Sequence, residues 1–338
     1  NSKEEESSSP TPSPPSGIRV LPLPRGRMIS FHHVHIMGIL NVTPDSFSDG
    51  GSYNTTVDGA VEQAMQMIED GASIIDIGGE STRPGAKEID IDIELKRTIP
   101  VIERLRQVSV SDVPISIDTR HSIVAKAAID AGADIVNDVS GGTFDPNMLP
   151  TVASLHVPMV IMHMRGTPET MQSMTNYKNV VSDVSTSLLR QSNKAQELGI
   201  PKCLQVLDPG IGFAKDHDDN LSLLKHCHDL RDRVGDMPLL LGPSRKRFIG
   251  TISGEDDAKE RDFGTLAACI AGMVNVMNVK NIMKREADGS MNKDVDMLVP
   301  PTILRVHNVK GVHQGVRVME AILNIMKREA DGSMNKDV

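Results

Sequence analysis

Polar side chains end several short apolar runs in this sequence, and their types favour one kind of chemistry. Asp118, Asn137 and Asp208 offer hydrogen-bond acceptors at the ends of three such runs. Acceptors of this kind suit a flat heterocycle that carries amino and ring N–H donors. Lys246, which follows another run, can bind a carbonyl oxygen or a ring nitrogen of the same heterocycle.

A second group of residues is suited to phosphate. Arg83, Arg305 and His307 form a cationic set, and an Arg guanidinium can bind two phosphate oxygens at once. Asn41 offers a hard oxygen ligand that can join a phosphate in holding Mg²⁺. The two groups together favour displacement of a phosphate-type leaving group from a flat nitrogen heterocycle. The sequence has neither a GxxxxGK[ST] phosphate-binding loop nor a GxGxxG motif after a predicted strand.

Eight short, nearly continuous apolar runs predict the strands that position these residues. They lie at 35–42, 73–78, 114–118, 134–138, 158–163, 204–208, 238–242 and 303–306. Helical periodicity between them predicts helices that include 57–70, 93–106, 122–131, 179–198 and 220–231. Repeated βα units of this number predict an α/β fold, the (β/α)₈ barrel. Because such a barrel gathers the carboxyl ends of all its strands on one face, the polar residues should converge on one pocket.

The composition bounds the domain organisation. Residues 1–27, acidic at first and then rich in Ser and Pro, are predicted to form a disordered linker or tail, with the barrel spanning 28–338. A net charge of −9 argues against non-specific nucleic-acid binding. No apolar run approaches the length of a membrane span. Three widely spaced Cys residues without a CxxC motif predict reduced thiols in an intracellular protein.

One segment occurs twice, letter for letter. NIMKREADGSMNKDV stands at 281–295 and again at 324–338. The second copy continues a predicted terminal helix, because Val316, Met319, Leu323 and Met326 keep helical spacing. The first copy falls where an αβ loop is normally about 2–6 residues long. We therefore interpret 276–301 as an insertion between the last two βα units. A genuine local duplication and a sequence-assembly or splicing error both stay open as its origin.

Seven motifs in order make the chain resemble dihydropteroate synthase. They are NVTPDSFSDGG, DIGGESTRPGA, SIDTR, VNDVSGG, LDPGIGFAK, GPSRKRFIG and RVHNV, and they run from about Met37 to Val309. The resemblance implies a TIM barrel that joins p-aminobenzoate to 6-hydroxymethyl-7,8-dihydropterin pyrophosphate with Mg²⁺. The products are 7,8-dihydropteroate and pyrophosphate, so the implied class is a transferase of folate biosynthesis.

The resemblance also implies a role for each matching residue. It assigns the pterin to Asp118, Asn137, Asp208 and Lys246, and the pyrophosphate to Asn41, Thr82, Arg83, Arg305 and His307. It places Mg²⁺ at Asn41, and p-aminobenzoate among Phe47, Thr82, Arg83, Pro84, Ser244 and Lys246. Asn41, Arg305, His307 and Lys246 are the predicted catalytic residues.

Two alternatives to this function stay open at the level of sequence. A pterin-binding methyltetrahydrofolate methyltransferase would keep Asp118, Asn137 and Asp208, but it would not need Arg83, Arg305 and His307. A barrel inactivated by the insertion at 276–301 would have its last strand, and with it Arg305 and His307, out of place. The resemblance further implies a homodimer, fusion to an upstream pterin kinase, and a cytoplasmic or mitochondrial location, with no nucleic-acid or membrane partner.

Overall fold

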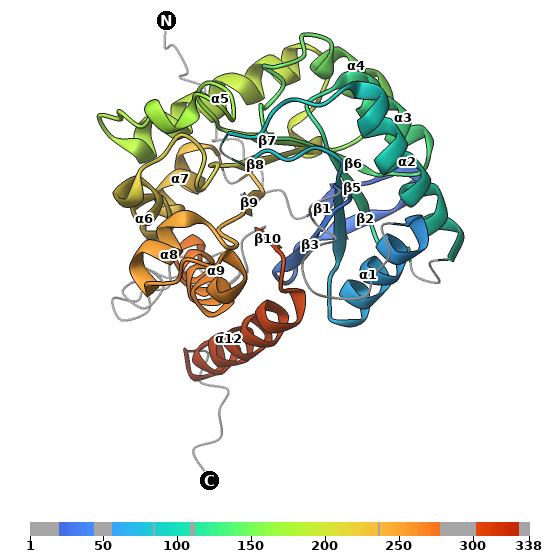
Figure 1. Cartoon of the computed structure of the whole chain (residues 1–338). Coiled ribbons are helices and arrows are strands. Elements are labelled where there is room, and N and C mark those ends of the chain that lie inside the picture. The colour runs from blue at the N-terminus through green and yellow to red at the C-terminus, as the bar shows by residue number, and fades with distance from the viewer. Residues whose placement is uncertain are drawn as a thin grey trace, which may run out of the picture.

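The computed structural model describes residues 20–43, 56–83, 85–108, 112–235, 237–277 and 302–330. Eight parallel strands of this part close into a barrel, in which each strand pairs with the next and the last pairs with the first (Figure 1). The strands are β3 (His35–Asn41), β4 (Ile74–Gly78), β5 (Ile115–Asp118), β6 (Ile135–Asp138), β7 (Met159–Met162), β8 (Gln205–Asp208), β9 (Leu239–Leu241) and β10 (Thr302–Val306). The predicted (β/α)₈ barrel is confirmed.

Helices surround the barrel between the strands. They are α1 (Val57–Glu69), α2 (Ile91–Val108), α3 (Ser122–Asp130), α4 (Met148–Leu155), α5 (Val180–Glu197), α6 (His217–Lys225), α7 (Cys227–Arg233), α8 (Arg247–Ser253), α9 (Asp262–Val276) and α12 (Val309–Ala330). No helix of the described ranges has the length and apolar character needed to cross a membrane.

The predicted helix at 220–231 is wrong, because two helices occupy this region. The chain leaves helical geometry at His226, whose φ of −111° and ψ of 30° separate α6 from α7. The first of the two also begins earlier than predicted, at His217. Asp216 caps it by accepting from the Asp219 N–H, and Asp219 accepts from the Asp216 N–H in return.

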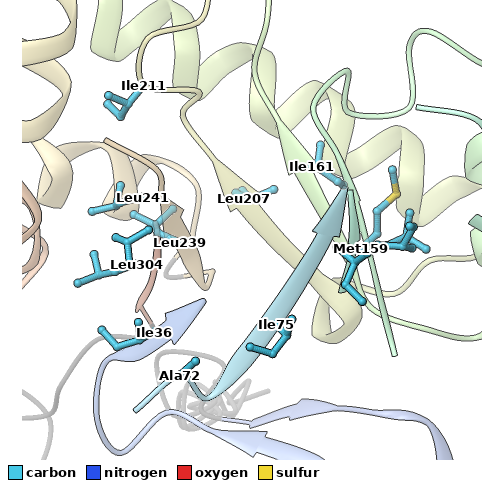
Figure 2. Packing of buried hydrophobic residues seen from close by; sticks show 14 of the residues in the cluster. Ile36, Ala72, Ile75, Met159, Ile161, Leu207, Ile211, Leu239, Leu241 and Leu304 are labelled. Atoms are coloured by element: carbon cyan, nitrogen blue, oxygen red, sulfur yellow. The ribbon is translucent and has the colours of Figure 1, made fainter. Parts of the chain in front are cut away.

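The strands carry two separate apolar clusters because successive side chains point to opposite faces of a strand. One face joins the cluster that includes the buried side chains of the helices; Figure 2 shows Ile36, Leu207 and Leu304 among its members. The other face fills the barrel interior with Met37, Ile74, Ile135, Val160, Val206, Leu240 and Ile303. This inner layer lies toward the amino-terminal half of the strands, so residues two positions further on point into the barrel nearer its carboxyl-terminal mouth.

A hairpin plugs the other end of the barrel. Strands β1 (Val20–Pro22) and β2 (Met28–Ser30) pair antiparallel, and Leu21, Leu23, Ile29 and Phe31 join the inner apolar cluster. The described fold therefore begins at Val20, which corrects the expected start at Met28. The sequence signal for this hairpin was weak, because each of its two strands is short and contains few apolar residues.

The last strand is in place despite the segment that precedes it. Residues 278–301, which include nearly all of the expected insertion, lie outside the described residues. Strand β10 pairs with β9 and with β3 in continuous register, with Arg305 opposite Met37. The predicted consequence of the insertion, a misplaced final strand, is therefore not observed.

Candidate active site

A polar layer lies directly above the inner apolar layer of the barrel. Each of its members stands two residues after an inward-facing side chain: Asp76 after Ile74, Asp118 after Ser116, Asn137 after Ile135, Asp208 after Val206, and Arg305 after Ile303. The four acidic and amide side chains are buried. The period of two along each strand therefore brings together the predicted residues Asp118, Asn137, Asp208 and Arg305.

Arg305 joins two carboxylates within this layer. Its Nε donates to Asp76 Oδ2 at 2.6 Å, and its Nη2 donates to Asp118 Oδ2 at 2.6 Å. Asn137 Nδ2 donates to the same oxygen of Asp76 at 3.1 Å. The other oxygen of Asp76 is buried without a hydrogen-bond partner among the described residues. Asp76 was not among the predicted site residues, although a carboxylate inside the apolar run IIDIG was the available signal.

Burial controls the charge of the acidic residues. It raises the pKa of Asp118 to about 7, against the opposing effect of Arg305. It also raises the pKa of Asp208 to about 6, although the Gly210 N–H donates to this carboxylate at 2.6 Å. The pKa of Arg305 is raised despite burial, because Asp76 and Asp118 favour its charged form. The layer thus holds one fixed cation, Arg305, together with two carboxyl groups, Asp118 and Asp208, whose pKa values are raised.

Lys246 lies at the mouth of the barrel on an aromatic ring. Its Nζ is 3.9 Å from the centre of the Phe213 ring, and desolvation lowers its pKa to about 8 against the effects of Asp208 and Asp118. Gly212, with φ of +81°, packs against its stem, since a Cβ there would lie 2.7 Å from Lys246 Cδ. Because glycine has no Cβ, the backbone at Gly212 can approach the aliphatic part of Lys246 this closely.

His307 and Ser244 form a hydrogen-bonded pair at the mouth of the barrel. The His307 backbone N–H donates to Ser244 Oγ at 3.1 Å, and that hydroxyl lies 2.9 Å from His307 Nδ1. Desolvation, followed by Arg245 and Arg305, holds the pKa of His307 well below its usual value. The lowered pKa favours the neutral ring, which carries one N–H. This corrects the expected cationic set, since His307 offers a neutral N–H donor.

The remaining predicted residues lie at the rim. A methyl group at Gly78 would lie 3.7 Å from both Asn41 Oδ1 and Asp118 Oδ2, so these two side chains flank the same space. Arg83 is exposed, and its charge acts on both His307 and Lys246. Thr82 is half-buried beside it. Phe47 and Pro84 lie outside the described residues.

A buried lysine supports the site from behind. Lys215 Nζ lies 3.1 Å from His163 Nδ1 and donates to the Phe213 carbonyl at 2.9 Å. Burial lowers the pKa of Lys215 to about 7, against the effect of Asp208. Lys215 was not predicted as a site residue, although it ends the GIGFAK segment that follows Asp208. The lysine thereby joins the ends of β7 and β8.

Comparison with known proteins agrees with this geometry. A family model described as pterin binding enzyme matches residues 37–281. The chain is 46% identical over 282 residues to a dihydropteroate synthase from Synechocystis sp., covering 82% of this chain and 95% of that protein. It is 42% identical over 315 residues to the mitochondrial folate synthesis bifunctional protein of Pisum sativum, covering 90% of this chain and 56% of that protein.

A solved structure gives the same result. The Xanthomonas albilineans dihydropteroate synthase with 4-aminobenzoic acid superposes with a TM-score of 0.74 at 38% identity, covering 88% of this chain and 96% of the other. The family model also spans Asn41, Asp76, Asp118, Asn137 and Asp208, which form much of the polar layer and its rim. This chain belongs to the family of pterin-binding enzymes.

Proposed function

We propose that the protein is a dihydropteroate synthase. It joins p-aminobenzoate to 6-hydroxymethyl-7,8-dihydropterin pyrophosphate and forms 7,8-dihydropteroate and pyrophosphate. The observation that carries this proposal is the buried set Asp118, Asn137 and Asp208 beneath Lys246, in a chain 46% identical to a dihydropteroate synthase. These side chains match the amino and N–H donors of a pterin ring.

The pterin binds flat across the polar layer in this proposal. Asp118, Asn137 and Asp208 accept its N–H donors, while Lys246 donates to a ring acceptor. The C–O bond of the hydroxymethyl carbon breaks, and pyrophosphate leaves with the electron pair. The positive charge that develops on the methylene carbon and the ring is stabilised by the buried carboxylates, which are already oriented before the reaction.

The arylamine then completes the reaction. Its nitrogen attacks the methylene carbon, forms the C–N bond, and loses a proton to water or to the departing pyrophosphate. Because the nitrogen lone pair of an aniline is free at neutral pH, no strong base is needed. Thr82, Arg83 and Ser244 lie at the rim where this second substrate must approach, and Phe47 and Pro84 remain predicted contacts.

The leaving group has N–H donors on one side of the mouth. Arg83 and a ring N–H of His307 supply two of them. Arg305 uses Nε and Nη2 for Asp76 and Asp118, and its Nη1, for which the described ranges record no partner, can donate to a phosphate oxygen without breaking either ion pair. This arrangement supports a role in pyrophosphate departure for all three residues.

Mg²⁺ fits the same side of the mouth. The amide oxygen of Asn41 has no hydrogen bond that the described residues record, and it flanks the same space as Asp118. Mg²⁺ takes one or two protein oxygens together with phosphate oxygens and water, so one amide oxygen is a sufficient protein ligand. The ion would supply positive charge to the leaving group. Loss of turnover in EDTA and its recovery with added Mg²⁺ would support this proposal.

A pyrophosphate-release assay tests the function. The full chain should release pyrophosphate from the pterin substrate only when p-aminobenzoate is present, at a rate that rises with its concentration. Folded protein that binds the pterin but shows no p-aminobenzoate-dependent release would contradict the proposal. Release of pyrophosphate without p-aminobenzoate would instead indicate a hydrolase.

We propose that two copies of the chain associate through α9 and α12. These helices pack on each other and expose Phe263 (89%), Val318 (61%), Ile322 and Ile325. Exposed apolar side chains of this kind mark an interaction site, and a second copy related by a two-fold axis would bury them against the same helices. Light scattering should give a dimer mass for the chain and a monomer mass for Phe263→Asp.

The pea relative gives two more proposals a basis, since its name describes a bifunctional mitochondrial protein. We propose that the chain occurs fused to a further folate-synthesis domain such as a pterin kinase, and that it acts in the mitochondrion or the cytoplasm. A protein larger than the 36.7 kDa of this chain on an immunoblot, and its distribution between cell fractions, would test both proposals.

A further inference from the structure

One buried carboxylate binds both ends of the loop that carries Thr82 and Arg83. Glu80 stands two residues after the end of β4 and is 6% exposed. The Ile89 N–H, two residues before α2, donates to Glu80 Oε1 at 3.3 Å. The loop between these residues therefore begins and ends at the same side chain.

Arg120 holds that carboxylate from the next strand. Its Nη2 donates to both oxygens of Glu80 at 2.9 Å, and its Nε donates to Oε2 at 3.2 Å. Arg120 is 4% exposed, and its guanidinium lies 4.2 Å from the centre of the Phe144 ring. The Arg120 guanidinium is thus held both by the Glu80 carboxylate and by a cation–π contact with Phe144.

The same strand end carries a predicted pterin contact. Arg120 follows Asp118 by two residues, and the Thr119 N–H between them donates to the Asn137 carbonyl at 3.0 Å. Strand β5 therefore presents Asp118 to the barrel interior and Arg120 to the loop that follows β4. Any shift of the loop relative to the pterin site must distort the Glu80–Arg120 pair.

We propose that Glu80 and Arg120 form a positioning pair that sets Thr82 and Arg83 at a fixed distance from the pterin acceptors. The proposal rests on the proposed function only in what Thr82 and Arg83 bind. Neither member of the pair belongs to the polar layer, so the pair acts through the loop. Its loss should affect the second substrate and leave pterin binding nearly unchanged.

A metal site at this place fits the contacts less well. Glu80, Glu94 and His121 bring ligand atoms within 4.8 Å of one another, the arrangement expected of a metal site. However, Arg120 already donates to both oxygens of Glu80, and His121 Nδ1 lies 2.8 Å from Glu94 Oε2. The guanidinium already supplies the positive charge that a metal ion would bring. His121 Nε2 also lies 3.6 Å from Glu88 Oε1, and the Gly85 N–H donates to the Pro168 carbonyl at 3.1 Å, which gives the loop two further attachments.

Steady-state kinetics of conservative variants test the proposal. In Glu80→Gln the amide can still accept from the Ile89 N–H, but the charge that orients Arg120 is lost. We expect the KM for p-aminobenzoate to rise about tenfold and kcat to fall several-fold, because a loop displaced by about 1 Å misplaces its binding groups. The Kd of the pterin substrate, measured by calorimetry, should stay within about twofold. Arg120→Lys should shift the same parameters in the same direction.

Controls separate this effect from general damage and from failure of the proposed function. Glu62→Gln, the same change on an exposed position of α1, should leave all parameters unchanged. Hydrogen exchange of the 79–90 peptide should speed up in Glu80→Gln, a readout that needs no turnover and so stands even if the chain proves to have another activity. A folded Glu80→Gln protein with unchanged exchange and an unchanged KM for p-aminobenzoate would overturn the proposal. Equal losses for both substrates would overturn it too.

Discussion

Both ends of the barrel bury carboxylates beside arginine. The plugged end has more arginines than carboxylates, whereas the open end has more carboxylates than arginines. At the plugged end, Asp134 alone accepts from Arg25, Arg27 and Arg106, and also from the Ile115 N–H. At the open end, Asp76 and Asp118 share the single guanidinium of Arg305. One oxygen of Asp76 there has no partner in the described part of the chain.

This difference separates a structural site from a binding site. A buried carboxylate whose acceptor sites are all filled fixes the elements around it, here the hairpin, α2 and the start of β6. Buried carboxylates with fewer donors than they can use leave acceptor capacity for a ligand, and they raise the free energy of the unliganded fold. Substitutions at the plugged end should therefore lower mainly the free energy of unfolding, and substitutions at the open end mainly the turnover.

The largest effect is expected at the open end for turnover. Asp118→Asn keeps the shape of the side chain and removes its charge from the site of developing positive charge. We expect kcat/KM for the pterin substrate to fall about 10²–10³-fold, the range found when one preorganised electrostatic group is removed. The midpoint of thermal unfolding should change by no more than a few degrees. Pyrophosphate release and calorimetry measure the two quantities, and retained turnover would contradict the proposed site.

The largest effect on stability is expected at the plugged end. Asp134→Asn leaves three arginines around a neutral amide, and we expect the free energy of unfolding to fall by about 3 kcal/mol. The kcat of the folded protein should be unchanged. Urea denaturation measures the first quantity. Arg104→Ala, which breaks the exposed ion pair with Asp58, is the control and should cost less than about 0.5 kcal/mol.

Asp76 tests the comparison within the open end itself. In Asp76→Asn, Arg305 and Asn137 lose a charged acceptor, so both should be less well fixed. Pterin affinity should fall about tenfold, the size of one charge-assisted hydrogen bond. The free energy of unfolding should change by less than about 1 kcal/mol, because the substitution also removes one of the two buried negative charges that share the single guanidinium of Arg305. A loss of stability as large as that of Asp134→Asn would remove the distinction between the two ends.

The smallest effect is a pH dependence of pterin binding. With pKa values of about 7 for Asp118 and about 6 for Asp208, both carboxylates are ionised at pH 8 and become protonated as the pH falls through these values. Protonation replaces an acceptor by an O–H donor, so the Kd of the pterin substrate should rise several-fold between pH 8 and pH 6. Calorimetry at a series of pH values measures it. In Asp118→Asn the part of this dependence near pH 7 should disappear.

Local pattern was enough to predict most of the polar layer. Apolar runs that end in Asp118, Asn137, Asp208 and Arg305 follow the two-residue period of a strand, and a parallel barrel brings such ends together. Asp76 was missed because it stands inside its apolar run, and its pairing with Arg305 joins residues 229 positions apart. No local pattern reports such a contact.

The charge state of His307 and the N-terminal hairpin also differ from the sequence-based prediction, and both differences have physical reasons. The neutral state of His307 depends on desolvation and on the arginines around it, which come from separate segments of the chain. The hairpin at Val20–Ser30 is short and rich in Pro and Arg, and it becomes ordered only because the barrel buries Leu21 and Phe31. Both features depend on contacts between segments that are distant in sequence, and the local propensity of one segment does not predict such contacts.

The apolar plug limits how an intermediate could pass from a fused domain to the active site. Leu21, Leu23, Ile29 and Phe31 pack across the lumen at the end opposite the polar layer. In a bifunctional relative, a domain joined ahead of this hairpin would be attached on the far side of the barrel from the mouth. A product of that domain could not travel along the barrel axis and would have to diffuse around the outside. Fusion of this kind would then serve co-expression and proximity, without an internal tunnel for the intermediate.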